Sequence, residues 1–261
     1  MRVAAVQLTS TADLDHNLER ADTLTRAAAA DGARLVVLPE KWSVLGRGDD
    51  LQNIVDAGAQ VMIDLTVPES TRENVRFAID HGIHSVVGTT GWDDRALAEL
   101  ESQLTQHPDV GVLIAPNFAV GAVLAMKFSE AAAAFFESAE VVELHHPDKL
   151  DAPSGTAART ASLIGKARRE AGVADSPDAT QTDPDGARGA VVDGVHVHSV
   201  RLRGLVAHQE TLLGNTGEQL TIRHDSFDRI SFMTGVVLGV REIHRHPGLT
   251  HGLDGYMDLS L

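Results

Sequence analysis

The chain has 261 residues and contains no cysteine, which excludes disulfide bonds, thiolate metal sites, iron–sulfur clusters and every mechanism that uses a cysteine nucleophile. Its formal net charge at pH 7 is −15, so its surface does not suit a nucleic acid, whose phosphates require positive charge. The longest apolar stretch, residues 110–126, is interrupted by Pro116 and Asn117 and is too short to cross a membrane. Residues 1–7 show no secretory signal, and we therefore expect a cytoplasmic protein.

The first half of the sequence alternates short apolar runs with segments of helical periodicity. Buried strands are predicted at residues 3–8, 34–39, 61–65, 85–88 and 110–115, and helices at 14–30, 69–80 and 93–104. Because the strand segments are apolar throughout, they are typical of a parallel sheet that is covered on both faces. We therefore expect an α/β fold with a doubly wound, Rossmann-like sheet.

The pattern changes after residue 117. Helices are predicted at about 120–137, 154–170 and 230–244, with a strand at 140–145 and a polar loop at 174–189. Three further runs, 195–202, 205–213 and 219–224, predict successive antiparallel strands with turns at Gly204 and at residues 214–215. We therefore expect a second α+β domain with a mixed or antiparallel sheet at residues 119–228, and a first domain made of residues 1–118 and 229–261.

The densest group of chemically useful side chains lies between residues 143 and 156. A predicted strand delivers His145 and His146 to a sheet edge, Lys149 follows in a polar loop, and residues 154–156 open a helix. The start of a helix has unpaired N–H groups that favour an anion, and Gly155 lets an anion approach the backbone closely. A histidine can give or take a proton near neutral pH. Together these residues predict a site for a small substrate with two negative charges that receives a proton.

Each of these features also has an ordinary structural explanation. A serine such as Ser154 at a helix start is usually an N-cap, and a lysine in a polar loop is most often solvated. Because side chains alternate along a strand, one of the two histidines can simply pack inward. The functional interpretation depends on the presence of all three features within about a dozen residues.

The same segment resembles the signature of a known family. Residues 143–156 read Glu-Leu-His-His-x-x-Lys-x-Asp-Ala-Pro-Ser-Gly-Thr, which is similar to the dihydrodipicolinate reductase family, and residues 64–66, 87–91 and 115–121 are also similar to segments of that family. From about residue 48 to residue 261 the chain is identified as a member. The resemblance implies an oxidoreductase that reduces 4-hydroxy-tetrahydrodipicolinate with NADH or NADPH in the diaminopimelate route to lysine. It also implies a homotetramer that is assembled through the sheet of the second domain.

The resemblance assigns roles to individual residues. His145 matches the proton donor and Lys149 the second catalytic residue, while His146, Gly155 and Thr156 match positions that hold the carboxylates of the substrate. Loops that line the nicotinamide cofactor are matched by Gly88, Thr89, Thr90, Ala115, Pro116, Asn117 and Phe118. Ligands of open α/β sheets lie outside the carboxyl ends of the strands, where these loops are predicted.

The first 50 residues depart from this family. The family has a glycine-rich turn after its first strand, whereas residues 7–13 contain no glycine, which should keep a pyrophosphate away from the backbone. Residues 2–8 and 32–42 are instead similar to the opening of nitrilase-type carbon–nitrogen hydrolases, in which the counterpart of Glu40 is a catalytic base. Such hydrolases require a nucleophilic cysteine, so that activity is excluded here. Glu40 also ends a predicted strand, where a Rossmann acidic residue meets a ribose, and Lys41 could face a 2′-phosphate.

Two function hypotheses follow. The first is an active reductase of this family, and the alternative is a catalytically impaired relative that binds dicarboxylates or only self-assembles. A titration with NADH and NADPH discriminates them, since the first turn carries no glycine. We expect no metal site: His196 and His198 share a strand face, but no third ligand is spaced to join them.

Overall fold

The computed structural model describes residues 3–5, 19–20, 23–24, 26–28, 30–31, 35–37, 55 and 58–259. The chain divides into two compact units. The first unit contains residues 1–116 and 236–258, and the second contains residues 117–235 and 259–261. Of the helices within the described ranges, none has the length and apolar character that crossing a membrane requires.

The first unit is built on parallel strands. Its four-stranded sheet has the order β11-β5-β4-β3, formed by β3 (Val61–Asp64), β4 (His84–Val87), β5 (Gly111–Ile114) and β11 (Gly248–His251). All three pairings within it are parallel. A separate pair, β1 (Val3–Ala5) and β2 (Leu35–Val37), is also parallel. The described residues between 19 and 30 are helical, as the sequence predicts for that segment.

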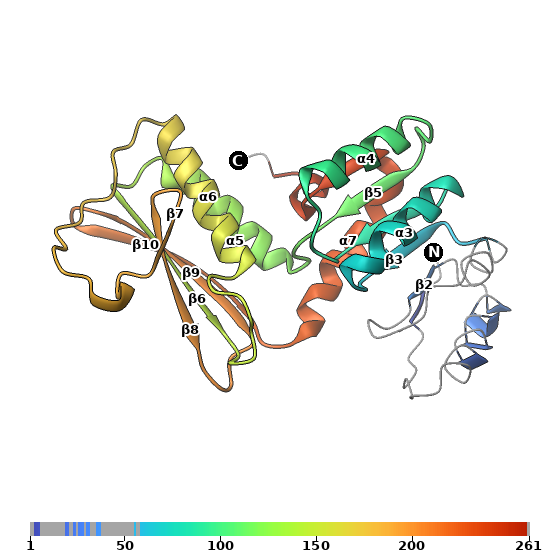
Figure 1. Ribbon diagram of the computed structural model, residues 1–261, viewed down its shortest axis with the longest axis horizontal. Coiled ribbons are helices and arrows are strands. Elements are labelled where there is room, and N and C mark those ends of the chain that lie inside the picture. Colours follow the sequence, from blue (N-terminus) through green and yellow to red (C-terminus); the bar gives the residue numbers. More distant parts are fainter. Residues whose placement is uncertain are drawn as a thin grey trace. The chain divides into compact units, whose positions relative to one another are not determined.

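Both faces of this sheet are covered, as the apolar strands predict (Figure 1). The helices are α3 (Pro68–Asp80), α4 (Asp94–Leu104) and α7 (Met233–Glu242), with 3-10 turns η3 (Ile243–Arg245) and η4 (Leu253–Tyr256). One core joins α3 and α4 to Val87, Val112 and Ile114. On α7, a side chain at Gly239 would come within 2.9 Å of Leu113, so this glycine lets the helix lie close to the sheet.

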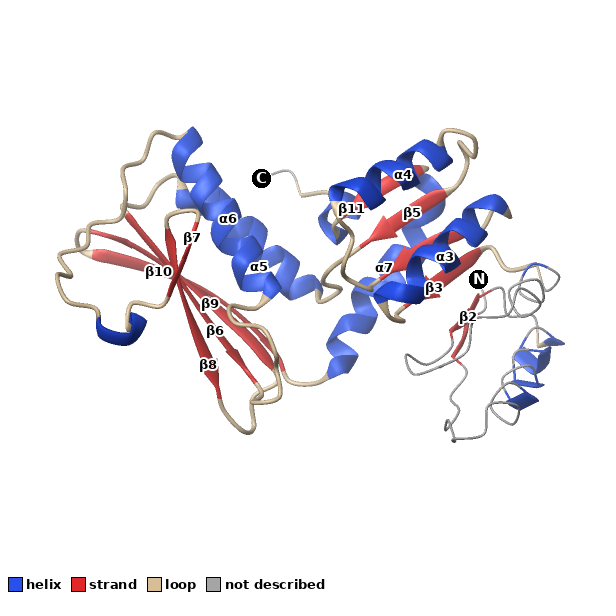
Figure 2. Cartoon of the chain, in the orientation of Figure 1, coloured by secondary structure: helices blue, strands red, loops and turns tan. Residues whose placement is uncertain are grey.

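The second unit has a five-stranded mixed sheet with the order β10-β9-β6-β8-β7. These strands are β6 (Ser138–His145), β7 (Ala190–Val192), β8 (Val195–Arg201), β9 (Ala207–Asn215) and β10 (Glu218–Ser226). Helices α5 (Val120–Ala133) and α6 (Gly155–Glu170) lie against one face of the sheet, over a core that includes Ala133, Val141, Ile164, Val197 and Leu213 (Figure 2). The 3-10 turns are η1 (Pro184–Gly186), within the loop predicted at 174–189, and η2 (Arg229–Phe232).

The strand order of this sheet is not evident from the sequence. The successive strands β8 and β9 run antiparallel, as predicted, but they are not neighbours, because β6 lies between them and pairs with both. The β6–β8 pairing is parallel, whereas β6–β9, β9–β10 and β7–β8 are antiparallel. A turn residue shows only that the chain reverses, and it does not determine which strand fills the neighbouring place. The short strands β7 and β11 have no prediction in the sequence.

Candidate active site

The site is organised around the carboxyl end of β6. Side chains alternate along a strand, so Ala139, Val141, Glu143 and His145 point to the face that α5 and α6 cover. The first two are apolar and belong to the core, but the last two are polar, and Glu143 is completely buried. The strand ends at His145, so the exposed His146 lies in the following turn rather than in the strand with it.

Hydrogen bonds from several residues hold the buried carboxylate of Glu143. Arg201, at the end of β8, donates to Oε2 through Nη1 at 2.9 Å and to Oε1 through Nη2 at 2.8 Å. The backbone N–H of Ser154 donates to Oε1 at 3.2 Å, and His145 Nδ1 lies 2.5 Å from Oε2. Burial by itself raises the pKa of Glu143, but the hydrogen bonds from Arg201, Ser199 and His145 outweigh it and lower the pKa below the usual value. Glu143 is therefore ionised at neutral pH.

His145 is neutral in this environment above mildly acidic pH. Burial lowers its pKa most strongly, the carboxylate of Glu143 acts in the opposite direction, and the positive charges of Lys149 and Arg201 lower it further. The net result is a pKa below the usual value of 6.5. An anion that binds beside this imidazole would raise its pKa and favour its protonated form.

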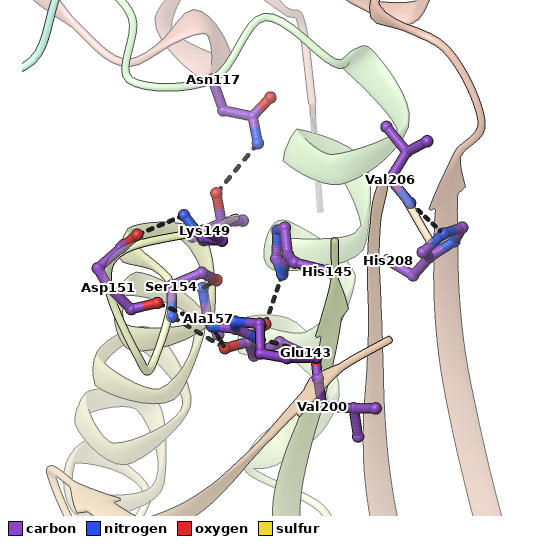
Figure 3. Close-up of polar contacts among 12 residues, drawn as sticks. Asn117, Glu143, His145, Lys149, Asp151, Ser154, Ala157, Val200, Val206 and His208 are labelled. Carbon is purple, nitrogen blue, oxygen red and sulfur yellow. Dashed lines mark hydrogen bonds and ion pairs between the residues drawn. The ribbon is translucent and has the colours of Figure 1, made fainter. Parts of the chain in front are cut away.

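Lys149 lies in the loop between β6 and α6 and faces an acidic neighbour. Its Nζ atom is 2.6 Å from Oδ1 of Asp151, and Figure 3 shows this pair on the loop beside His145. The hydrogen bond from Lys149 is the largest cause of a lowered pKa at Asp151. The backbone carbonyl of Asp151 accepts a hydrogen bond from Arg201 at 2.8 Å. The loop that carries the ammonium group is therefore tied to the same arginine as Glu143.

The start of α6 forms the third part of the site. Ser154 is the N-cap, and its hydroxyl accepts a hydrogen bond from the N–H of Ala157 at 3.2 Å. A side chain built on Gly155 would meet no atom within 4 Å, so a ligand has room beside this residue. The carboxylate of Asp151 accepts a hydrogen bond from the backbone N–H of Gly155, so an arriving anion would replace Asp151 there. Thr156 Oγ1 accepts a hydrogen bond of 3.1 Å from Asn117, which precedes α5 (Figure 3). The cap explanation of Ser154 is thus correct, and it is compatible with an anion site at the next two residues.

In chemical terms the second unit brings together an imidazole, an ammonium group and an exposed helix N-terminus. The two positive features can hold carboxylates, and the imidazole can deliver a proton. The sequence predicts His145, Lys149, Gly155 and Thr156 for this site, and all four lie in the segment that runs from the carboxyl end of β6 to the start of α6. The exposed His146 follows directly on the same turn.

Sequence reasoning missed Glu143 and Arg201 as members of the site. A signal for Glu143 is present: it is an acidic residue on the buried face of an apolar strand, and such a charge needs a partner. Arg201 is the register partner of His145 across the parallel β6–β8 pairing, which no local pattern predicts.

The histidines considered as a metal pair have other partners. His198 Nε2 lies 2.7 Å from a carboxylate oxygen of Glu140, and His196 Nδ1 lies 2.8 Å from the carbonyl oxygen of Arg188. Within the described part of the chain, no group of three or more histidine or acidic residues is arranged to hold a metal ion. Residues 7–13, Glu40 and Lys41, on which the expectations about the first turn depend, lie outside the described residues.

A parallel sheet covered on both faces, together with a second unit that carries an imidazole, an ammonium group and an exposed helix N-terminus, is typical of two-domain oxidoreductases of the dinucleotide-dependent class. The family profile described as "Dihydrodipicolinate reductase, N-terminus" matches residues 3–118, and the profile of the C-terminus matches residues 121–257. The chain belongs to the dihydrodipicolinate reductase family. The first match begins at residue 3 and so includes the segment that resembles nitrilase-type hydrolases.

Individual relatives agree with the profiles. The chain is 61% identical over 232 residues to a 4-hydroxy-tetrahydrodipicolinate reductase of Streptomyces griseus subsp. griseus, covering 89% of this chain and 90% of the relative. It is 60% identical to the protein of the same name from Nocardia farcinica, over 88% of this chain and 91% of that one. A solved dipicolinate-bound dihydrodipicolinate reductase from Paenisporosarcina sp. TG-14 is similar with a TM-score of 0.74 and 32% identity, covering 97% of this chain and 98% of that one.

Hydrogen bonds and packing tie together the loops that follow β3 and β4 in the first unit. The buried carboxyl group of Asp64 accepts hydrogen bonds from Thr66, Asn74 and Thr89. Gly91 has a φ of +92° and lies against Pro68, the first residue of α3. This contact holds the loop after β4 against the start of α3. These contacts fix Gly88 and Thr89 at the carboxyl edge of the sheet, with Thr90 exposed beside them.

Proposed function

We propose that this chain catalyses the reduction of 4-hydroxy-tetrahydrodipicolinate to tetrahydrodipicolinate with NADH or NADPH, in the diaminopimelate route to lysine. The single observation that carries this proposal is the arrangement of His145, Lys149 and the exposed backbone at Gly155 between the end of β6 and the start of α6. Relatives that bear the reductase name and are about three-fifths identical over most of this chain support it, including the one from Streptomyces griseus at 61%. The same identity favours an active enzyme over a catalytically impaired relative.

The substrate is a small cyclic dicarboxylate. The solved relative from Paenisporosarcina is described as bound to dipicolinate, which is a dicarboxylate of this kind. In this chain, His146, Gly155 and Thr156 hold the substrate carboxylates, with the N–H groups at the start of α6 as donors and Lys149 as the full positive charge. The hydrogen bond from Asn117 fixes the hydroxyl of Thr156 for this role.

The chain's own residues hold and move the proton. His145 carries the transferable proton at Nε2, because its Nδ1 faces the carboxylate of Glu143. Lys149 binds a carboxylate and stabilises negative charge during protonation. Bound NADH or NADPH supplies the hydride. Residues that would hold its nicotinamide end are Gly88, Thr89, Thr90, Ala115, Pro116, Asn117 and Phe118.

The two units have different roles in this proposal. Residues 1–118 and 229–261 form the cofactor-binding domain, and residues 119–228 form the substrate-binding and oligomerisation domain. Homotetramer formation uses the sheet face opposite α5 and α6, to which Val142, Leu144, Val200 and Leu212 point by strand alternation. Light scattering on the purified chain is expected to give a mass near four times 27.8 kDa, and a monomer would contradict this assembly. We place the enzyme in the cytoplasm, where NADH and NADPH are supplied.

The test is a reductase assay on the full-length chain. Loss of reduced nicotinamide absorbance is followed with 4-hydroxy-tetrahydrodipicolinate and, in parallel, without it. Each cofactor is also titrated by fluorescence, with and without dipicolinate as a dicarboxylate. Turnover that requires the substrate supports the proposal. Millimolar or absent cofactor binding together with no turnover would establish the impaired relative instead, with residues 7–13 as the physical reason.

A further inference from the structure

Glu143 lies between the proton-carrying His145 and the guanidinium group of Arg201, and it has no exposed surface. We propose that Glu143 and Arg201 form a positioning pair that fixes which nitrogen of His145 carries the transferable proton and sets how readily it is given up. This inference rests on the proposed function and adds two residues to the site. Neither is assigned contact with the substrate: both act through the imidazole and through the loop that leads to α6.

A buried carboxylate such as that of Glu143 is costly unless it is paired. A negative charge removed from water needs both a counterion and hydrogen bonds to its lone pairs, otherwise it would be protonated. Arg201 supplies the counterion through two parallel hydrogen bonds to the two oxygens of Glu143, the geometry in which a guanidinium group binds a carboxylate best. Arg201 therefore keeps Glu143 ionised. Its own side chain is 21% exposed, so it is also partly desolvated.

The carboxylate of Glu143 also determines the tautomer of the His145 imidazole. An ionised carboxylate can only accept hydrogen bonds, so the 2.5 Å contact with Glu143 requires that Nδ1 of His145 carries a proton. The other nitrogen, Nε2, is then the atom that gains and loses the proton. Because the strand backbone fixes both residues two positions apart on one face, the ring can turn only by losing this hydrogen bond. The arrangement thus selects one tautomer and one ring orientation.

Glu143 and Arg201 also link the imidazole to the anion-binding part of the site. Glu143 also accepts the N–H of Ser154, the N-cap of α6, and Arg201 also donates to the carbonyl oxygen of Asp151. One carboxylate therefore positions the proton donor and the start of the helix that receives the substrate carboxylates. Arg201 holds the intervening loop, on which Lys149 lies, to the end of β8. A loss of either residue should disturb geometry on both sides of the substrate.

The charges that face His145 predict opposite effects for the two residues. Glu143 favours the imidazolium form, whereas Lys149 and Arg201 disfavour it, and burial disfavours it most. Removing the charge of Glu143 should therefore lower the pKa of His145. Removing Arg201 should raise it, because one cation is lost and Glu143 is left with the imidazole as its remaining cationic partner. If Glu143 and Arg201 only supported the fold, their removal would not shift the pKa of His145 in opposite directions.

The test measures the pKa of His145 by NMR in the full-length chain, with isotope-labelled histidine and His145→Gln to assign its signal. Glu143→Gln, which keeps the shape of the side chain, is expected to lower the pKa by about one unit, and Arg201→Gln to raise it by about one unit. Arg201→Lys keeps the charge but loses the paired hydrogen bonds, so it should shift the pKa less than Arg201→Gln. Shifts of the same sign in Glu143→Gln and Arg201→Gln, or unchanged values in folded protein, would overturn the proposal.

Matched controls come from the far end of α6. Arg169→Gln and Glu170→Gln remove the same charges from exposed positions near the last turn of that helix. They should leave the pKa of His145 and the reductase activity unchanged. If Arg201→Gln does not fold, Glu143→Gln and Arg201→Lys still decide the outcome, since both keep a hydrogen-bonding group in the buried space.

Kinetics separate this inference from the proposed function. In an active reductase, Glu143→Gln should lower kcat about 100-fold through misplacement of the proton donor, and the midpoint of its pH profile should move with the pKa of His145. If the wild-type chain showed no reductase activity, the proposed function would fail. The NMR shifts would still test the positioning pair, because they are measured without substrate or cofactor.

Discussion

Lys149 and Asp151 form an ion pair across one turn of the loop before α6, with 2.6 Å between Nζ and Oδ1. Asp151 is 56% exposed and Lys149 is 21% exposed, so the ammonium group is held by a partner that is itself largely in water. Exposed ion pairs contribute only about 0–1 kcal/mol. A substrate carboxylate can therefore replace Asp151 at small cost, and Asp151 keeps Lys149 in place until it arrives.

We therefore expect Lys149→Ala to lower kcat/KM about 100-fold, which is the usual loss when one group that stabilises developing charge is removed. The free energy of unfolding should change by about 1 kcal/mol or less, because Asp151, the partner of Lys149, is largely in water. Steady-state kinetics and urea unfolding measure the two quantities. Lys166→Ala is the control, since Lys166 is an exposed lysine of α6 that faces Glu170. Equal kinetics in wild type and Lys149→Ala would remove the anion-holding role.

The pH dependence of the reaction should follow His145. Its pKa lies below 6.5, and the reaction needs the protonated imidazole, so kcat/KM for the free enzyme should fall as pH rises through that pKa. His145→Gln should lose this dependence and lower kcat about 100-fold to 10,000-fold. A profile that keeps the same midpoint in His145→Gln would assign the proton to another group.

Dicarboxylate binding should move the same pKa upward. A substrate analogue with two negative charges neutralises the cations near the imidazole, and opposite charge nearby favours the protonated form. The NMR pKa of His145 is expected to rise when dipicolinate is added to the wild-type chain. The rise should be smaller in Lys149→Ala at saturating dipicolinate, where the anion is held less closely. No shift on saturation would mean that the anion binds away from His145.

Gly155 offers a way to separate binding from stability. Its φ is not in the left-handed region and a Cβ there would meet nothing within 4 Å, so Gly155→Ala should fold normally. It should even be more stable by about 0.5–1 kcal/mol, because alanine loses less backbone entropy than glycine. The added methyl group would occupy the open space at the helix start and raise KM. A stable Gly155→Ala variant with an unchanged KM would show that no substrate group approaches this backbone.

The sequence predicts the part of the site that lies in one local segment, but it does not predict the partner that comes from a distant strand. His145, Lys149 and the Ser154 cap lie within one short segment, so local patterns of strand, loop and helix start are sufficient to bring them together. Arg201 is 58 residues from Glu143 and reaches it only because β8 pairs in parallel with β6, a choice made by the packing of the whole sheet. The alternating apolar pattern of β6 marks Glu143 as inward-facing, but it does not identify its partner.

The environment of His84 predicts that the first unit loses stability at acidic pH. Its Nδ1 accepts a hydrogen bond of 2.9 Å from the backbone N–H of Gly111, which requires a neutral ring. Burial, and secondly the charge of His244, lower the pKa of His84 below 6.5. A lowered histidine pKa means that the unfolded chain binds more protons, so this contribution to stability is complete above pH 6.5 and is lost as pH falls through the pKa of the folded state.

We therefore expect unfolding of the wild-type chain in urea to need less denaturant at about pH 5.5 than at about pH 7.5, since protonation of His84 removes a hydrogen bond worth about 1 kcal/mol. His84→Asn keeps an acceptor near the same place but does not titrate, so its loss between the two pH values should be smaller. His107→Asn is the matched control, because His107 lies on the surface of the same unit near Asp80. Equal pH dependence in wild type and His84→Asn would show that the strand pairing at Gly111 does not depend on a neutral imidazole.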